Sequence, residues 1–328
     1  MAALKLNFAL DDIPWNLAIL DGSVTAKGIA LNAFHAEEPT ERHEAMHRGE
    51  FDAAEVGYSG FIRDQVLGVG YPQLALPAWG NRGLRHRALV ARKGSRVQSL
   101  SDLKGGRIGN VHYGMTTNLW ARNALSEAGV NLEEITWVVT VADDMTPSDL
   151  KIQVLGEVQS GGLLWPLLAD DEIDAVIAPG HNFFYGTFRN FSEAKSAARL
   201  PEQYKGKFES LISDTQTCID YVRRTKVYPI IHTMTVKREI LEEHPWVATS
   251  LVDMFREAAK LAPRYLSDEE RELMATEREG VGFDPYAQGW NESQEVTTHT
   301  LMKAMVEQHL IPHTIDPDTF MVPGYRDL

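Results

Sequence analysis

Strand-like and helix-like segments alternate along most of this chain, and this alternation limits its possible folds more than any other feature. Short apolar runs typical of strands occupy residues 4–10, 29–34, 51–56, 74–79 and 86–92. Helix-like segments at residues 14–20 and 40–48 separate the first of them. Such alternation is typical of α/β proteins with largely parallel sheets. We therefore predict an α/β architecture.

A second α/β unit is expected to begin near residue 99. It contains a helix over residues 116–128 that ends at Gly129, a residue suited to terminate a helix. The chain then returns to the first unit through residues 227–236, and a long helix follows Pro245. We predict two lobes joined by two hinge segments, with a ligand cleft between the lobes. Residues 1–93 and 228–328 form the first lobe, and residues 94–227 form the second.

Composition restricts the classes of partner. The 328 residues carry a formal net charge of −14, which disfavours general binding to nucleic acid or to an anionic membrane. No apolar run approaches the roughly 20 residues that cross a bilayer. The single cysteine, Cys218, excludes internal disulfides and thiolate zinc clusters. Because the sequence opens on a strand instead of a secretory leader, we expect a cytoplasmic protein.

One short motif matches a zinc protease. His43, Glu44 and His47 form an H-E-x-x-H string, which on a helix places two imidazoles on one face. The third ligand of the extended motif is missing, because Glu50 occupies the position that would need glycine and no histidine follows at the required spacing. A solvated, charged helix is the favoured interpretation, and a zinc protease is a remote alternative.

Two other segments favour an anion site. Arg85 and His86 stand where a strand is expected to begin beside the cleft, and an arginine there can clamp a carboxylate through two hydrogen bonds. Tyr113, Thr116 and Thr117 lie between a strand end and a helix start. Free backbone N–H groups and threonine hydroxyls at such a start can hold an anion, although simple helix capping would account for them too.

Several longer segments resemble one known family. They are residues 51–59 (FDAAEVGYS), 84–89 (LRHRAL), 116–122 (TTNLWAR) and 228–233 (YPIIHT). Together they are similar to the 4,5-dihydroxyphthalate decarboxylase family, a branch of the type II periplasmic-binding-protein-like fold, over nearly the whole chain. Residues 111–114 (VHYG) depart from the family pattern Pro-Glu-Tyr-Gln, which leaves the exact substrate open.

The resemblance implies decarboxylation of a hydroxylated aromatic acid without an organic cofactor. That chemistry needs a base for the ring hydroxyl, an acid for the ring carbon and a clamp for any second carboxylate. The candidates for proton transfer are His86, His112 and His232, with Glu55 orienting one of them or accepting the hydroxyl proton. The candidates for substrate binding are Arg85, Tyr58, Ser59, Tyr113, Thr116, Thr117 and His181. No metal is expected, although histidines that converge with Glu55 could hold a divalent ion.

Two other functions remain open at this level. The same fold could serve a solute-binding protein for a small organic anion, since function lies in the cleft and not in the fold. Another lyase or a dehydratase that acts on a related cyclic acid would also fit. In each case the partner is a small molecule, and self-association through the C-terminal helices is possible.

Overall fold

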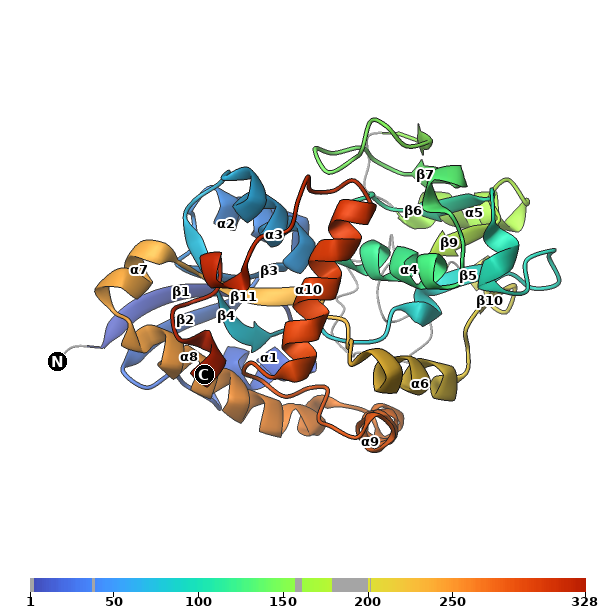
Figure 1. Cartoon of the computed structure of the whole chain (residues 1–328). Coiled ribbons are helices and arrows are strands. Elements are labelled where there is room, and N and C mark those ends of the chain that lie inside the picture. Colours follow the sequence, from blue (N-terminus) through green and yellow to red (C-terminus); the bar gives the residue numbers. More distant parts are fainter. Residues whose placement is uncertain (1–2, 37–38, 157–160, 179–199, 201) are drawn as a thin grey trace.

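Two mixed β-sheets form the centres of two lobes, which lie side by side in the computed structural model (Figure 1). The structure describes residues 3–36, 39–156, 161–178, 200 and 202–328. Within these residues, no helix is long and apolar enough to span a membrane.

The first lobe is built on five strands in the order β2-β1-β3-β11-β4. Strand β1 pairs in parallel with β2 and β3, whereas β11 is antiparallel to both β3 and β4. Helices α1 and α8 pack against each other on one side of this sheet, and α2 and α3 lie on the other side (Figure 1). The strands are β1 (Leu4–Leu10), β2 (Ile29–His35), β3 (Ala53–Gly57), β4 (Gln73–Trp79) and β11 (His232–Lys237), and the helices are α1 (Pro14–Leu20), α2 (Pro39–His47), α3 (Tyr58–Leu67), α7 (Arg238–Glu243) and α8 (Trp246–Leu261).

The second lobe is built on six strands in the order β10-β5-β9-β6-β7-β8. A separate apolar core that includes Trp165 and Phe208 fills one face of this sheet. The strands are β5 (Leu89–Arg92), β6 (Arg107–Asn110), β7 (Thr136–Val139), β8 (Ile152–Val154), β9 (Ala175–Ile177) and β10 (Phe208–Ser210), and the helices are α4 (Thr116–Glu127), α5 (Leu164–Ala169) and α6 (Thr215–Thr225).

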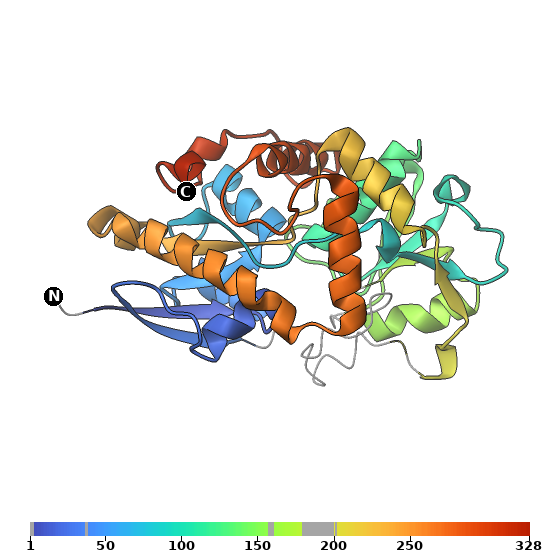
Figure 2. The ribbon, with the colours of Figure 1, turned by 90° about the horizontal axis from the view of Figure 1, so that it is seen from below.

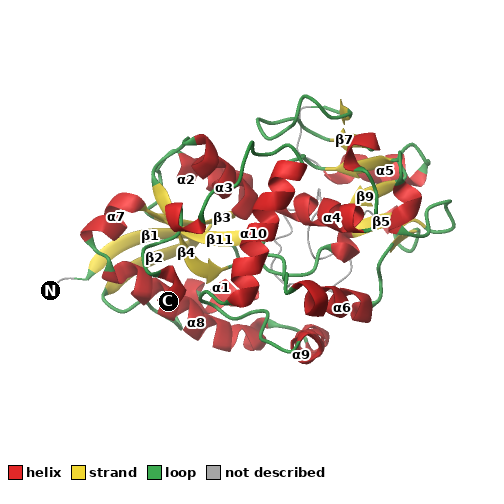
Figure 3. Cartoon of the chain, viewed as in Figure 1, coloured by secondary structure: helices red, strands yellow, loops and turns green. Residues whose placement is uncertain are grey.

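The C-terminal helices connect the lobes. Helix α9 (Asp268–Val281) follows α8 of the first lobe and packs against α6 of the second (Figure 2). Helix α10 (Glu292–Glu307) packs against both α3 and α4, and Figure 3 shows it between the two sheets. Each of these helices therefore contacts both halves of the molecule.

The two segments that cross between the lobes pair with each other. Arg82 and Ile230 form an isolated antiparallel bridge. The Gly83 N–H donates to the Pro229 carbonyl at 3.1 Å, and the Ile231 N–H donates to the Asn81 carbonyl at 2.8 Å. The hinge is thus a short two-stranded ribbon.

The α/β class and the two-lobed arrangement are as predicted, with two differences. Pairing is less parallel than expected, because β11, β5 and β10 all run antiparallel to a neighbour. Leu89–Arg92, which the expected division after residue 93 puts in the first lobe, pairs with β9 and β10 of the second sheet. Residues His86–Ala88, expected to open that strand, form a turn of 3₁₀ helix instead.

Candidate active site

Adjacent strands β3 and β11 bring a carboxylate and a histidine together. Glu55 Oε1 lies 2.8 Å from His232 Nδ1, although the residues are 177 positions apart in the sequence. Glu55 is completely buried and His232 is 9% exposed. When Nδ1 carries the proton it donates to Glu55, which fixes the ring and leaves Nε2 to exchange a proton with a ligand. Among the described residues, His232 Nε2 has no hydrogen-bond partner.

A buried polar network holds Glu55 in place. Its Oε2 accepts hydrogen bonds from Asn16 Nδ2 at 2.6 Å and from the Asp11 N–H at 3.1 Å. The Arg42 guanidinium lies 3.6 Å from the Asp11 carboxylate and donates to the Glu55 carbonyl, so it offsets two buried negative charges. Gly80 leaves the space for the carboxylate, because a Cβ there would lie 2.4 Å from Glu55 Oε1.

The same network could hold a divalent cation. Asp11, Glu55 and His232 each offer a ligand atom within 4.8 Å of the others, and so do Asp11, Asp12 and His35. Carboxylate and imidazole ligands suit several divalent metals. Both oxygens of Glu55 already accept hydrogen bonds, Oε2 from Asn16 and the Asp11 N–H and Oε1 from His232, so the geometry favours an acid–base pair.

Asn81 connects this pair to the predicted carboxylate clamp. The backbone N–H of His232 donates to the Asn81 carbonyl at 3.2 Å, and Arg85 Nη2 donates to Asn81 Oδ1 at 3.0 Å. Arg85 Nη1 also donates to the Gly83 carbonyl at 3.1 Å, and its Nε lies 3.5 Å from the Thr117 hydroxyl. The arginine is 4% exposed and is therefore held in place from both lobes.

The start of α4 meets the first lobe through hydroxyl groups. The Ser59 N–H donates to Thr116 Oγ1 at 3.1 Å, the two hydroxyl oxygens are 2.7 Å apart, and Ser59 Oγ donates to the Gly114 carbonyl at 2.9 Å. Thr116 therefore joins the lobes and does not cap its helix, whose N-cap residue Met115 makes no side-chain bond. These contacts place Ser59, Thr116, Thr117, Arg85 and His232 around one region.

His112 supplies a second histidine–carboxylate pair on the loop before α4. Its Nδ1 lies 2.9 Å from Asp143 Oδ2, and its side chain is 14% exposed. Burial alone would raise the pKa of Asp143, but the close approach and charge of His112 and the bonds from Thr146 and Met145 hold that pKa below its ordinary value. Asp143 is thus an ionised carboxylate beside His112, although their contact does not have the geometry of a well-directed hydrogen bond. His112 stands two positions before Gly114, whose carbonyl accepts a hydrogen bond from Ser59.

The structure does not bring three predicted site residues into this group. His86 packs edge-on against Tyr221, and burial together with the charges of Arg224 and Arg87 lowers its pKa to about 4. The Tyr58 hydroxyl lies 3.1 Å from Thr298 of α10, within the core.

Tyr113 is also a core residue, with its ring 3.8 Å below the Arg122 guanidinium. The side chains of His86, Tyr58 and Tyr113 thus contact Tyr221, Thr298 and Arg122, and their roles in the reaction stay predictions. His181 lies outside the described residues.

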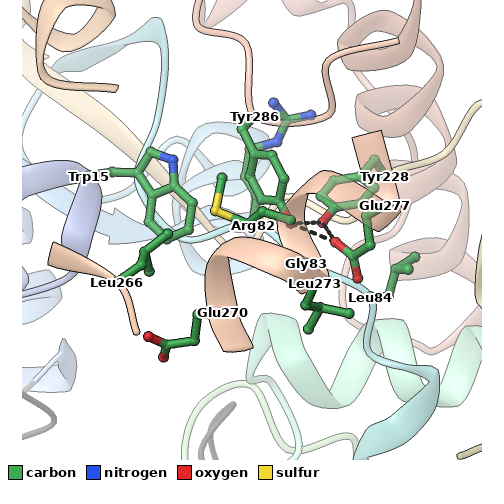
Figure 4. Close-up of a pocket in the computed structure, with 11 residues that line it drawn as sticks. Trp15, Arg82, Gly83, Leu84, Tyr228, Leu266, Glu270, Leu273, Glu277 and Tyr286 are labelled. Atoms are coloured by element: carbon green, nitrogen blue, oxygen red, sulfur yellow. Dashed lines mark hydrogen bonds between the residues drawn. The ribbon is translucent and has the colours of Figure 1, made fainter. Parts of the chain in front are cut away.

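A separate pocket lies near the hinge and does not include the acid–base pair (Figure 4). Trp15, Leu266 and Met274 contribute its apolar wall. The hydroxyls of Tyr228 and Tyr286 both donate to Glu277 Oε2, at 2.7 Å and 2.5 Å. Because these polar groups satisfy one another and no predicted site residue lines the pocket, it is not the candidate site.

Sequence reasoning missed four residues of the site. Three of them follow the end of a strand, where side chains of an α/β sheet gather around ligands: Asp11 after β1, Asn81 after β4 and Asp143 after β7. The fourth, Asn16, lies within α1. A strand-end position was the available signal for the first three, but none of the four residues had a known partner in the sequence.

Comparison with known proteins identifies relatives of the chain. It is 27% identical over 325 residues to a 4,5-dihydroxyphthalate decarboxylase of Comamonas testosteroni, covering 94% of this chain and 93% of that protein. The chain is a relative of the 4,5-dihydroxyphthalate decarboxylases. A protein of the same name from Pseudomonas putida is 28% identical over 190 residues, covering 55% of this chain and 72% of that one. The relationship predicted from the motifs is confirmed, although no family model matches the chain.

Solved structures establish the fold of the chain. The periplasmic aliphatic sulphonate binding protein SsuA from Escherichia coli superposes with a TM-score of 0.60 at 14% identity, covering 99% of each chain. The alkanesulfonate-binding protein SsuA from Xanthomonas axonopodis pv. citri, bound to MOPS, gives 0.55 at 13% identity, covering 98% and 97%. The predicted type II periplasmic-binding-protein-like fold is confirmed. At this identity the likeness concerns the fold alone.

Proposed function

We propose that this protein catalyses the non-oxidative decarboxylation of a hydroxylated aromatic acid, 4,5-dihydroxyphthalate or a relative, in the breakdown of aromatic compounds. The observation that carries the proposal is the buried Glu55–His232 pair at 2.8 Å. A carboxylate that orients a histidine is a standard arrangement for moving protons near neutral pH. The names of the two relatives give the substrate class.

The chemistry requires the ring itself to accept electrons. In 4,5-dihydroxyphthalate, each carboxylate has a hydroxyl group para to it. Removal of that hydroxyl's proton pushes electron density to the carbon bearing the carboxylate, and this carbon takes up a proton. The bond to the carboxylate then breaks, carbon dioxide leaves, and the electron pair of that bond restores the aromatic ring. The hydroxyl regains its proton, so one proton is consumed overall.

In this proposal the two histidines divide the proton transfers. His232 Nε2 takes the hydroxyl proton and later returns it, while Glu55 stabilises the charged imidazole. His112, beside Asp143, protonates the ring carbon. These two roles are supported by the short distances from histidine to carboxylate, which are 2.8 Å for His232 and Glu55 and 2.9 Å for His112 and Asp143. Each such proton transfer typically accelerates a reaction by about 10²- to 10⁴-fold.

Arg85 and the start of α4 bind the carboxylate that remains. The guanidinium is anchored at Asn81 and Gly83 and faces the Thr117 hydroxyl. The first N–H groups of α4 lack acceptors within the helix and carry partial positive charge, which favours an anion there. The proposal includes a cytoplasmic location, which cell fractionation would check, and possible self-association, which size-exclusion chromatography would check.

The test is turnover by the purified protein of 4,5-dihydroxyphthalate and a panel of hydroxybenzoates, with and without a chelator. Carbon dioxide release and ring absorbance are followed for the wild type and for Arg85→Ala. We expect release from at least one acid, with KM raised roughly tenfold or more in the variant, because a charge-assisted hydrogen bond contributes about 1.5–3 kcal/mol. Arg92→Ala, which removes an exposed partner of Asp171, is the control.

Two results would contradict the proposal. Saturable binding of these acids without turnover would identify a solute-binding protein. Conversion to a product that keeps both carboxylates would identify another lyase or a dehydratase. Loss of turnover with chelator would leave the decarboxylase in place and assign it a divalent cation.

A further inference from the structure

Helices α2 and α3 bring together two histidines and a carboxylate that the proposed reaction does not use. His47 Nδ1 lies 2.9 Å from Asp64 Oδ2, and His43 Nε2 lies 3.4 Å from the same oxygen. The two imidazoles are one helical turn apart on α2, and Asp64 comes from α3. One ligand atom from each residue lies within 4.8 Å of the other two.

This cluster supplies the third ligand that the sequence motif lacked. The expected spacing for a zinc protease fails after His47, but the tertiary structure places Asp64 beside both histidines. Glu44, the residue that would act as the base of a protease, is 61% exposed and pairs with Arg48. The arrangement is therefore that of a metal site without the protease catalyst.

The distances suit a tetrahedral ion. Zinc bonds of about 2.0–2.2 Å at tetrahedral angles separate ligand atoms by about 3.3–3.5 Å. The distance from His43 to Asp64 falls in this range, and the distance from His47 to Asp64 is shorter by about half an ångström. Both histidine side chains are partly exposed, at 24% and 38%, so neither ring is fully enclosed and each can adjust to an ion.

The surroundings leave room for both rings and hold the carboxylate. The Asp64 side chain is only 5% exposed. A Cβ at Gly60 would lie 3.0 Å from His43, and one at Gly70 would lie 2.6 Å from His47. Glycine at both positions therefore lets the imidazoles lie close to the chain of α3 and the loop after it.

We infer that His43, His47 and Asp64 bind one divalent transition-metal ion of the zinc class, with water completing its coordination. The ion joins α2 to α3 on the outer side of the first lobe. Two imidazoles and one carboxylate match the ligand preference of Zn²⁺, Co²⁺ and Ni²⁺, and not that of Mg²⁺ or Ca²⁺. The role is structural, and it is independent of the decarboxylation.

The test is titration of the chelator-treated protein with Co²⁺, followed by visible absorption and by displacement with Zn²⁺. We expect one tightly bound ion with a tetrahedral spectrum and a higher melting temperature. Binding should weaken at pH 5.5, because imidazole ligates only in its neutral form. His47→Ala and Asp64→Asn should weaken binding roughly 100-fold or more, since even outer-shell partners cost about 10- to 100-fold.

Matched variants distinguish this site from metal bound elsewhere on the protein. Glu44→Gln should bind as the wild type does, and so should His299→Ala, which removes an exposed histidine paired with Glu295 at the same helical spacing. His232→Ala tests whether the ion binds instead to the group formed by Asp11, Glu55 and His232. Circular dichroism confirms that each variant is folded, and the wild-type spectrum tests the site without any variant. Absence of binding by the wild type, or binding that survives His47→Ala but not His232→Ala, would overturn the inference.

Discussion

At the scale of single residues, the candidate site depends on how tightly Glu55 is enclosed. Its carboxylate accepts bonds from Asn16, Asp11 and His232, so each of its oxygens is engaged. This enclosure, more than the presence of a histidine, separates His232 from the other histidines that the structure describes. His232 has the fixed orientation that a proton-transfer group needs.

A change at Gly80 should disturb this orientation without replacing either residue of the acid–base pair. In Gly80→Ala the new Cβ would lie 2.4 Å from Glu55 Oε1, so the carboxylate must move and His232 with it. We expect kcat to fall about 10²-fold, the cost typical of a displacement of about 1 Å, with a smaller change in KM. Steady-state kinetics would check this.

Gly156→Ala is the matched control, since its Cβ would meet only the Thr140 carbonyl at 4.0 Å. A Gly80→Ala variant with wild-type kcat would show that the position of Glu55 does not matter for turnover.

At the scale of elements, the return segment and α9 are joined by one buried carboxylate. Glu277 accepts hydrogen bonds from Tyr228, on the segment that returns to the first lobe, and from Tyr286 after α9 (Figure 4). Burial, followed by the charge of Glu277, raises the pKa of Tyr228 well above its ordinary value. The Tyr228 hydroxyl therefore keeps its proton at neutral pH and donates it in a hydrogen bond to Glu277.

Removing this hydroxyl should destabilise the molecule. In Tyr228→Phe, Glu277 loses a donor inside the protein, which costs about 1–3 kcal/mol of unfolding free energy. Urea denaturation would measure the loss. Tyr265→Phe is the control, because its hydroxyl bonds to the exposed Asp21 and should contribute about 1 kcal/mol or less. Equal losses in the two variants would contradict a special role for the buried network.

At the scale of the whole molecule, His86 links stability to pH. Its pKa falls from about 6.5 in the unfolded chain to about 4 in the native state, chiefly through burial. Between these values the unfolded chain binds a proton that the native state does not, so stability falls as pH is lowered from about 6.5 to about 4. Over this pH range the unfolding free energy should fall by on the order of 3 kcal/mol in total.

Replacing His86 with phenylalanine should remove this pH-dependent part of the stability. Phenylalanine keeps the edge-on contact with Tyr221 but cannot titrate. We expect His86→Phe to lose less unfolding free energy than the wild type between pH 7 and pH 5, as measured by urea denaturation at both values. His299→Phe, at an exposed position, should behave as the wild type does. Identical pH slopes in wild type and His86→Phe would refute the assignment.

The positions of helices and strands could be predicted from the sequence more accurately than the contacts between side chains. Strand β1 and helix α1 match their expected ranges, because apolar pattern and Pro14 determine them locally. Glu55 and His232 were both candidates, yet their pairing depends on the register of β3 against β11, which no local pattern contains.

Side-chain direction was the other limit on prediction. Tyr58 and Tyr113 follow strand ends as expected, but one points to α10 and the other lies beneath Arg122. The direction of a side chain at a strand end depends on neighbours from other parts of the chain. A strand-end position therefore identified the site but not its members.

The most direct test of the account is carbon dioxide release from 4,5-dihydroxyphthalate by the wild type, His232→Ala and the control His299→Ala. We predict release by the wild type and the control, and a kcat about 10²- to 10⁴-fold lower in His232→Ala, with the acid still bound. Release by His232→Ala at the wild-type rate would contradict the assigned acid–base pair, and no release by the wild type from any hydroxylated aromatic acid would contradict the function itself.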